Sequence, residues 1–350
     1  MVRLWLLVSV AIIFASAVFV AMLLFDLAPY LRNTPERYAH DKGYLPRVLV
    51  IVPCRGTDIN LHRNLLSLTR QSYRRYDIVG VVDSEDDPAA SHVRSAGIRL
   101  LVSRYAKGNA SGKVRAIAHA IRRSGNYDVY AIADSDISVG SSWLSSLVAP
   151  LSDRSIGIST MFPRFSPVSG GFWQMVKLVW GFAGEGLMDN KATRFSWGGS
   201  MAFRSSLVKG KSLDMFVNSS YSVSDDISIT KIAKSKGLDI AYVKKPQPAV
   251  YSNDSFSKFV EWSNRQTALS TFGYRKNLYY GIFFYSAELI LMVSGFFLSL
   301  YVSAAFIVFF LHLAKSEAKN ICAGTVVQPA DSSHSGPHAH IYAKAIEEIV

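Results

Sequence analysis

Aspartates occur in three places where their type and spacing could hold a cation or take up a proton: Asp83, Asp134 with Asp136, and Asp225 with Asp226. Each place alone also fits an ordinary role, a solvated strand end for the first two and a helix N-terminus for the third. Together they predict a site that binds a nucleoside diphosphate through Mg²⁺ or Mn²⁺, because these ions prefer oxygen ligands and share them with substrate phosphates. A further carboxylate could remove the proton from an acceptor hydroxyl.

The elements that must position these aspartates alternate between strand and helix patterns. Continuous apolar, β-branched runs predict buried strands at residues 47–54, 76–83, 98–103 and 127–134. Apolar residues at helical spacing predict helices at residues 60–73 and 112–123. This alternation predicts an α/β fold with a doubly wound, mostly parallel sheet, whose ligands lie beyond the carboxyl ends of the strands. Asp83 and Asp134 both fall at that edge.

The second half of the chain is less regular. Residues 172–182, FWQMVKLVWGF, predict either a core helix or an interfacial helix that meets a membrane-dissolved substrate, because Trp and Lys suit the headgroup boundary. Gly198 and Gly199 would let the backbone approach a ligand closely. Ser224 is predicted to cap the N-terminus of a helix that Gly237 ends.

Two apolar segments predict membrane anchorage. Residues 1–25 contain an uncharged run long enough to cross a bilayer core of about 30 Å. A retained anchor is favoured there over a cleaved signal peptide, whose apolar stretch would be about 7–15 residues. Residues 278–314 predict a second membrane segment, for which one tilted helix and a tight hairpin both stay open. A juxtamembrane linker is predicted at 26–46, the catalytic domain at 47–275 and a polar tail at 315–350.

The formal net charge of the chain is +12. A nucleic-acid partner is not expected, because the sequence lacks basic motifs interleaved with aromatic residues. Part of the excess flanks the two apolar segments instead, where basic residues favour the cytoplasmic side and anionic lipid headgroups. These flanking residues are Arg32, Arg37, Lys42, Arg47, Arg275, Lys276, Lys315 and Lys319. Two cysteines, Cys54 and Cys322, imply no disulfide framework. The sequence therefore predicts an integral membrane protein whose central domain faces the cytoplasm.

Six motifs in the central domain carry a family resemblance. In chain order they read PCRG, VVDSEDDPA, SGKVRAIAHAI, AIADSDISVGSSWL, GGSMAFR and SDDISITKIAKSKG. Their order and spacing resemble those of family 2-like glycosyltransferases of the GT-A fold, and most of all the ceramide glucosyltransferase branch. The resemblance covers about residues 47–275 and implies a GT-A-type sheet and a transferase that uses a UDP-sugar donor.

The resemblance also implies a role for each matched position. The residues expected near the nucleotide-sugar are Pro53, Arg55, Gly56, Asp83, Lys113 and Asp134. Asp134 and Asp136 match the metal-binding pair, with Asp136 as the direct ligand. Asp226, rather than its neighbour Asp225, matches the general base. The expected acceptor region comprises Gly198, Gly199, Asp225 and Trp262.

One motif departs from the family pattern. Relatives carry (Gln or Arg)-x-x-Arg-Trp shortly after the general base, whereas this chain reads Trp262-Ser263-Asn264-Arg265-Gln266 in the same register. Arg265 keeps the cation that steadies the leaving diphosphate, so the resemblance implies a catalytic role for it. Because the flanking residues differ, the identity of the acceptor stays open.

The expected reaction is an inverting transfer of a hexose, glucose by the resemblance, from a UDP-sugar to a lipid hydroxyl such as that of ceramide. Asp226 would deprotonate the acceptor at the cytoplasmic face of the membrane. One alternative is a transferase that acts on polyprenyl phosphate or on a growing polysaccharide. Another is a catalytically inactive membrane scaffold, against which the intact carboxylates argue.

Overall fold

The computed structural model describes residues 43–103, 110–189, 191 and 194–273, together with the isolated positions 10, 14, 17, 279, 282 and 286. The chain divides into two compact units. The first is Thr34–Phe259, and the second joins Met1–Asn33 to Val260–Val350. Both sheets and all of the predicted site aspartates belong to the first unit.

No helix within the described residues is long and apolar enough to cross a membrane. The two predicted membrane segments, at 1–25 and 278–314, lie outside the described residues apart from isolated positions. The predicted tail at 315–350 and most of the linker at 26–46 also lie outside them. The membrane segments, the linker, the tail and the domain boundaries at 47 and 275 stay predictions.

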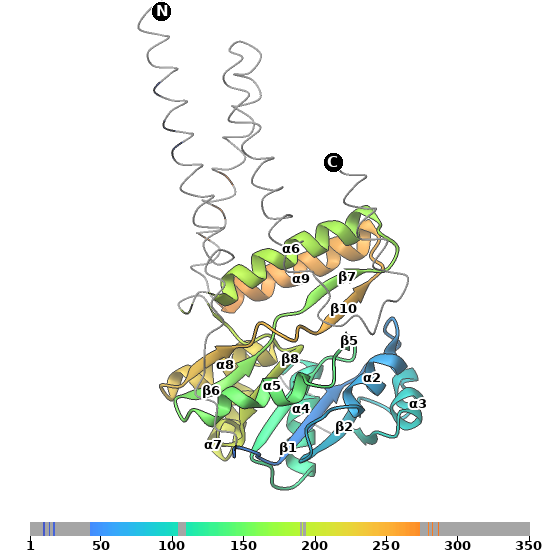
Figure 1. The fold of residues 1–350 in the computed structure, drawn as a ribbon, viewed down its shortest axis with the longest axis vertical. Coiled ribbons are helices and arrows are strands. Elements are labelled where there is room, and N and C mark those ends of the chain that lie inside the picture. Colours follow the sequence, from blue (N-terminus) through green and yellow to red (C-terminus); the bar gives the residue numbers. More distant parts are fainter. Residues whose placement is uncertain are drawn as a thin grey trace, which may run out of the picture. The chain divides into compact units, whose positions relative to one another are not determined.

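A seven-stranded sheet forms the centre of the first unit (Figure 1). Its strands are β1 (Val48–Pro53), β2 (Tyr76–Val82), β3 (Arg99–Val102), β4 (Val129–Ala133), β6 (Ile156–Thr160), β8 (Ser200–Arg204) and β9 (Asp239–Tyr242). Their spatial order is β3-β2-β1-β4-β8-β6-β9. All neighbouring strands are parallel except β8, which is antiparallel to both β4 and β6. The predicted α/β fold with a mostly parallel sheet is confirmed.

Helices cover both faces of this sheet. β1 is buried from Val48 to Val52, and β4 is buried along its whole length. On one face, α4 (Gly112–Arg123), α7 (Lys211–Asn218) and α8 (Asp225–Ser235) share an apolar cluster with residues of β1 and β2. α2 (Leu61–Thr69) contacts α3 (Pro88–Ser95), which packs on β2 and β3. This double burial explains why the strands read as continuous apolar runs.

Gly80 of β2 shows that α3 lies on the opposite face from α4. Val79 and Val81 belong to the apolar cluster on the α4 side. Because side chains alternate along a strand, position 80 faces the other way. A Cβ on Gly80 would lie 2.6 Å from Cγ1 of Val93 in α3. The helix therefore packs on the strand at a distance that requires glycine.

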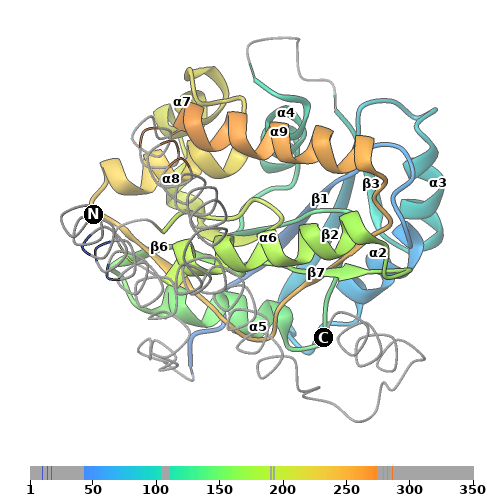
Figure 2. The ribbon, with the colours of Figure 1, turned by 90° about the horizontal axis from the view of Figure 1, so that it is seen from above.

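A second sheet of three strands begins directly after Asp136. Its strands are β5 (Ile137–Ser138), β10 (Ala249–Ser252) and β7 (Arg164–Pro167), in the order β5-β10-β7. β10 is antiparallel to β5 and parallel to β7. α6 (Phe172–Asp189) runs along β7 (Figure 2). The close fit depends on Gly181, where a Cβ would lie 2.7 Å from the ring of Phe165.

The remaining elements complete the two units. They are α5 (Trp143–Val148), the 3-10 turns η1 (Ala149–Ser152) and η2 (Ser205–Val208), and α9 (Phe256–Gly273). α9 begins in the first unit and continues into the second at Val260.

The aromatic stretch at 172–182 forms the start of α6. It has features of both predicted alternatives, the core helix and the interfacial helix. Gln174 and Lys177 are buried, with 3% and 7% exposure. Phe172 and Trp180 are 71% and 43% exposed, whereas Trp173 stacks on Phe259 with ring centroids 5.3 Å apart. The helix thus turns polar side chains inward and part of its aromatic surface outward.

Two predicted helix ends can be compared with the structure. Gly237 follows α8 with φ +68°, as expected of a glycine that ends a helix. The helix expected to reach Tyr73 is α2, and it already ends at Thr69. It ends early because Ser72 bonds across to the loop before α5, where its N–H and its hydroxyl both donate to the carbonyl of Ser141.

Gly80→Ala should lower the free energy of unfolding by about 1–3 kcal/mol, because the added methyl group overpacks the contact with Val93. Gly140→Ala is the matched control, since no described atom lies within 4 Å of its Cβ position. The control should change the free energy by less than about 0.5 kcal/mol. Urea unfolding monitored by tryptophan fluorescence compares the two. Equal effects would contradict the close packing of α3 on β2.

Candidate functional site

The carboxyl ends of three neighbouring strands meet at one edge of the main sheet. Asp83 directly follows β2 and Asp134 directly follows β4, as predicted. Pro53 ends β1, and beyond it Gly56 adopts φ +65° and donates its N–H to Oδ1 of Asp87 at 2.9 Å. This is the edge at which sheets of this type bind their ligands.

The N-terminus of α4 lies at the same edge. Ser111 caps it, accepting the N–H of Val114 at 3.3 Å. A Cβ on Gly112 would lie 3.6 Å from Oδ2 of Asp83. The exposed Asp83 and the start of α4 are therefore neighbours, and the free N–H groups of a helix start favour an anionic ligand there.

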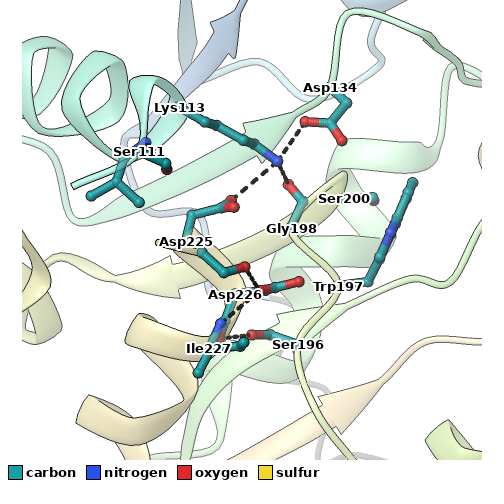
Figure 3. A network of polar contacts seen from close by, with 12 residues as sticks. Ser111, Lys113, Asp134, Ser196, Trp197, Gly198, Ser200, Asp225, Asp226 and Ile227 are labelled. Carbon is teal, nitrogen blue, oxygen red and sulfur yellow. Dashed lines mark hydrogen bonds and ion pairs between the residues drawn. The ribbon is translucent and has the colours of Figure 1, made fainter. Parts of the chain in front are cut away.

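Lys113 connects the two predicted carboxylate pairs (Figure 3). Its Nζ lies 2.6 Å from Oδ1 of Asp134 and 3.2 Å from Oδ2 of Asp225, and it donates to the carbonyl oxygen of Gly198 at 3.2 Å. The strand end at β4, the start of α8 and the turn before β8 thus converge on one ammonium group. The sequence predicted each residue separately, and the structure brings them together.

Lys113 and its partner Asp225 differ in burial, and the pKa of each is shifted. The side chain of Asp225 is 6% exposed, and that of Lys113 is 28% exposed. Burial raises the pKa of Asp225 to about 6, although Lys113 opposes that rise. Burial also lowers the pKa of Lys113, but the carboxylates of Asp134 and Asp225 outweigh it and leave the pKa above its ordinary value. Lys113 therefore stays positively charged at physiological pH.

Asp136 has a different environment from Asp134. Its Oδ1 is buried and has no hydrogen-bond partner in the described part of the chain. Burial is the main cause that raises the pKa of Asp136 to about 7. The charges of Asp134 and Asp58 add to the rise, and those of Lys113 and Lys177 oppose it. A buried carboxylate oxygen without a partner is costly unless another group, such as a cation, satisfies it.

These residues fit a hard divalent cation. Asp136 supplies the unsatisfied oxygen, and Asp134 follows the end of β4 two residues earlier. The described residues contain no group of three or more His, Cys, Asp or Glu side chains that could hold a metal. A pair of carboxylates completed by substrate phosphates is the usual arrangement for magnesium bound with a nucleotide. Because Lys113 engages Asp134, Asp136 is the better placed of the two as a direct ligand.

Asp226 faces different surroundings from its neighbour Asp225. Its Oδ1 accepts the N–H of Ile227 at 2.7 Å and also the hydroxyl of Ser224. Its main-chain carbonyl accepts the hydroxyl of Ser196 at 3.0 Å. Ser224 is the N-cap residue, as predicted, but its side chain bonds Asp226 rather than a backbone N–H. Asp226 is partly exposed while Asp225 is buried against Lys113, so Asp226 is the more accessible carboxylate.

The adjacent glycines of the turn before β8 are explained by protein contacts. A Cβ on Gly198 would lie 2.6 Å from Oδ2 of Asp225. A Cβ on Gly199 would overlap the ring of Trp197. The carbonyl of Gly199 also accepts the N–H of Asp134 at 3.0 Å. The sequence predicted that the backbone at these glycines approaches a ligand. In the structure the backbone lies close to the side chains of Asp225 and Trp197.

Three further predicted site residues lie in other segments of the chain. Trp262 and the exposed Arg265 lie on α9 beyond Phe259, in the second unit. Arg55 is exposed beside Gly56. Their predicted roles in binding the acceptor, the diphosphate and the nucleotide stay predictions.

Two charged residues that act on Asp136 had not been predicted. Asp58, in the segment after β1, accepts the hydroxyl of Ser135 at 2.5 Å. Lys177 on α6 pairs with Asp254 at 2.7 Å. The one feature of the sequence that could have indicated a role for Asp58 is its position after the first strand. The sequence carries no signal for Lys177, because its proximity to Asp136 arises through the second sheet.

Comparisons with known proteins place the chain in a family. A profile of Glycosyl transferase family 21 matches residues 4–343. No curated protein sequence matches the chain.

Two solved structures match the chain in a comparison of structures. The first is the mannosyltransferase PcManGT from Pyrobaculum calidifontis in complex with GDP-Man and Mn²⁺, with a TM-score of 0.54 and 18% identity over 96% of this chain and 90% of that chain. The second is glucosyl-3-phosphoglycerate synthase from Mycobacterium tuberculosis in complex with Mn²⁺, UDP and glucosyl-3-phosphoglycerate, with a TM-score of 0.47 and 16% identity over 69% and 86%. The first supports the GT-A-type fold. Because the family profile spans nearly the whole sequence, the chain belongs to glycosyl transferase family 21 and is a glycosyltransferase.

Proposed function

We propose that the protein is a membrane-bound, inverting glycosyltransferase that moves a hexose, glucose by the resemblance, from a UDP-sugar to a lipid hydroxyl such as that of ceramide. Mg²⁺ or Mn²⁺ is the proposed cofactor, and the catalytic domain is assigned to the cytoplasmic face. The observation that carries this proposal concerns Oδ1 of Asp136 at the ligand-binding edge of the sheet. This oxygen is buried and has no hydrogen-bond partner among the described residues.

The donor half of the proposal rests on charge. Asp136 and Asp134 offer carboxylate oxygens to a cation, and the start of α4 offers N–H groups to a diphosphate. Lys113 adds a fixed positive charge between them. The mannosyltransferase of similar fold was solved with GDP-Man and Mn²⁺. We assign the same two classes of ligand here, with UDP as the nucleotide because of the family resemblance.

The transfer step follows from the more accessible carboxylate. Asp226 takes the proton of the acceptor hydroxyl while the acceptor oxygen forms a bond to the anomeric carbon, from the face opposite UDP. The bond between the anomeric carbon and the diphosphate oxygen breaks, and UDP leaves with the electron pair. A divalent cation held by Asp136 and Asp134 would neutralise negative charge on that leaving group. Lys113 and Arg265 are assigned to stabilise the same charge electrostatically.

The acceptor half rests on apolar surface. Phe172, Phe256 and Trp180 are 71%, 58% and 43% exposed, on α6 and at the start of α9. Trp173 lies between them, with its ring centroid 4.7 Å from that of Phe256. Aromatic side chains of this kind suit the boundary between water and lipid. Together with the apolar segments at 1–25 and 278–314, they support a lipid acceptor.

Asp226→Asn should abolish sugar transfer, with at least about a 100-fold loss of kcat, because the variant cannot take up the acceptor proton. UDP-sugar affinity should stay within a few fold of wild type. Asp225→Asn is the matched control, because the same change next door removes a partner of Lys113 but leaves the proposed base intact. It should weaken donor binding and retain transfer. Transfer assays and calorimetric titration with the UDP-sugar measure both effects.

Two outcomes would contradict this assignment. Near wild-type transfer by Asp226→Asn would show that no base is needed there, and would favour an acceptor that is already anionic, such as polyprenyl phosphate. Loss of transfer with intact donor binding in Asp225→Asn alone would identify Asp225 as the base.

Asp136→Ala should remove the dependence of UDP affinity on Mn²⁺, because it deletes the proposed direct ligand. In the wild type, Mn²⁺-dependent affinity should fall about tenfold for each pH unit below about 7 and level off above it, since a carboxylate must lose its proton to bind a metal and the pKa of Asp136 is raised to about 7. Asp83→Asn serves as the control and should change UDP affinity without changing its metal dependence. Calorimetry with and without Mn²⁺ decides; an unchanged metal dependence in Asp136→Ala would show that the ligand assignment is wrong.

Expression in a host that lacks glycolipids should produce a new hexosyl lipid, detected by mass spectrometry of the lipid extract. The Asp226→Asn variant should produce none. The proposed function fails if no glycolipid appears and the purified protein releases no UDP from common UDP-sugars in the presence of a membrane lipid extract. That result would favour the inactive scaffold.

A further inference from the structure

The segment from Asp58 to Ser72 forms a polar brace along the loop that carries Asp134 and Asp136. This segment comprises the turn after β1, α2 and the residues just beyond it. Its contacts with residues 135–144 include hydrogen bonds made by side chains, across 69 to 77 positions of sequence. The reaction chemistry does not explain these contacts, and the sequence motifs did not indicate them.

Ser135, between the two aspartates, is held from both its side chain and its main chain. Its hydroxyl donates to Oδ2 of Asp58 at 2.5 Å. Its carbonyl accepts from Nδ2 of Asn64 at 3.1 Å. Asn64 is fully buried and Ser135 is 8% exposed, so water competes little for these bonds. Nδ2 of Asn64 also donates to the carbonyl of Ile59 at 3.3 Å, which links Asn64 to the turn that bears Asp58.

Further along α2 the same face continues the contact. The hydroxyl of Ser67 accepts the N–H of Val139 at 3.1 Å. Gln71 donates to the carbonyl of Gly140 at 3.1 Å and accepts the N–H of Leu144 at 3.0 Å. Positions 64 and 67 lie three residues apart on α2, so they fall on one side of the helix, and Gln71 follows just beyond its end at Thr69. The brace is therefore a row of polar side chains, with Asp58 and Asn64 at the end next to the site.

The carboxylates on either side of Ser135 need such support. Oδ1 of Asp136 is buried with no hydrogen-bond partner among the described residues, and neighbouring carboxylates repel one another. On the other side, the N–H of Asp134 bonds the carbonyl of Gly199, and Ile137 pairs with Val250 of β10. The sheets therefore anchor Asp134 and Ile137, and the brace anchors Ser135 between them.

We propose that Asp58 and Asn64 are positioning residues of the transferase, which orient Asp134 and Asp136 toward a divalent cation by holding Ser135 between them. The proposal rests on the proposed function, since it assumes that these aspartates bind a metal with UDP. Asp58 acts as a hydrogen-bond acceptor in this role and not through its charge. Groups that hold metal ligands in place typically contribute about 10–100-fold to metal affinity.

The test compares Asp58→Ala with Asp58→Asn in the full chain. Mn²⁺ affinity is measured by calorimetry at saturating UDP, and thermal unfolding is measured without ligands. Asp58→Ala should weaken Mn²⁺ binding about 10-fold or more. Asp58→Asn keeps an acceptor oxygen for Ser135 and should stay within about threefold of wild type. Ser135→Ala should match Asp58→Ala, and the double variant should be no weaker than either, because both changes delete one bond.

Gln71→Ala is the matched control within the brace. It removes three side-chain hydrogen bonds, with the N–H of Leu144 and the carbonyls of Gly140 and Ser67, so it should lower the unfolding temperature while leaving Mn²⁺ affinity unchanged. A variant that lowers the unfolding temperature without weakening Mn²⁺ binding would behave like this control and would have no positioning role. Asn64→Leu, which removes the bond to the carbonyl of Ser135, gives a second variant if Asp58→Ala does not fold, and it should also weaken Mn²⁺ binding about 10-fold.

Four outcomes would overturn the inference. Unchanged Mn²⁺ affinity in both Asp58→Ala and Asn64→Leu would show that the brace does not orient the aspartates. Asp58→Asn as weak as Asp58→Ala would show that charge, not the hydrogen bond, is what counts. Failure of the wild type to bind UDP in a Mn²⁺-dependent way would remove the proposed function, and the inference with it. Mn²⁺-dependent binding in the wild type that Asp136→Ala abolishes and the Asp58 variants leave unchanged would sink the inference alone.

Discussion

Crowded negative charge is the constraint on which the rest of this structure depends. Asp134 and Asp225, from distant parts of the chain, share the single ammonium group of Lys113. Asp136 is left with a buried oxygen that has no partner in the described part of the chain. Such a group is costly unless a proton or a cation satisfies it. This cost is what supports the proposal that the site binds a divalent cation.

The main sheet meets this constraint through its topology. Asp83 and Asp134 follow parallel strands on either side of β1, so the direction of the strands brings both to one edge. The antiparallel strand β8 reverses the chain there, which places Gly198 beside Asp225 and Lys113. The starts of α4 and α8 complete the edge, and a helix start suits either an anion or an acidic side chain.

The three-stranded sheet and the polar side chains of the brace make contacts with the loop that follows β4. β5 begins at the residue after Asp136 and pairs with β10. Asn64 and Asp58 form hydrogen bonds with the carbonyl and the hydroxyl of Ser135, respectively. The loop is thus fixed before any ligand binds, so little binding energy is lost in ordering it. In a glycosyltransferase whose donor chemistry depends on electrostatic stabilisation of a leaving group, such rigidity has a direct benefit.

The sequence alone predicted the strands β1 to β4, the helices α2, α4, α6 and α8, and the three aspartate positions, because apolar periodicity and turn residues act over short distances. Family motifs added the roles of Lys113 and Asp226. Only the tertiary structure decided that Lys113 bridges Asp134 to Asp225, that Gly198 exists to admit Asp225, and that Asp58 holds Ser135. Each of these contacts joins residues far apart in the chain. A pattern within one segment cannot encode which partner another segment will present, and that choice rests on how the two sheets and their helices pack.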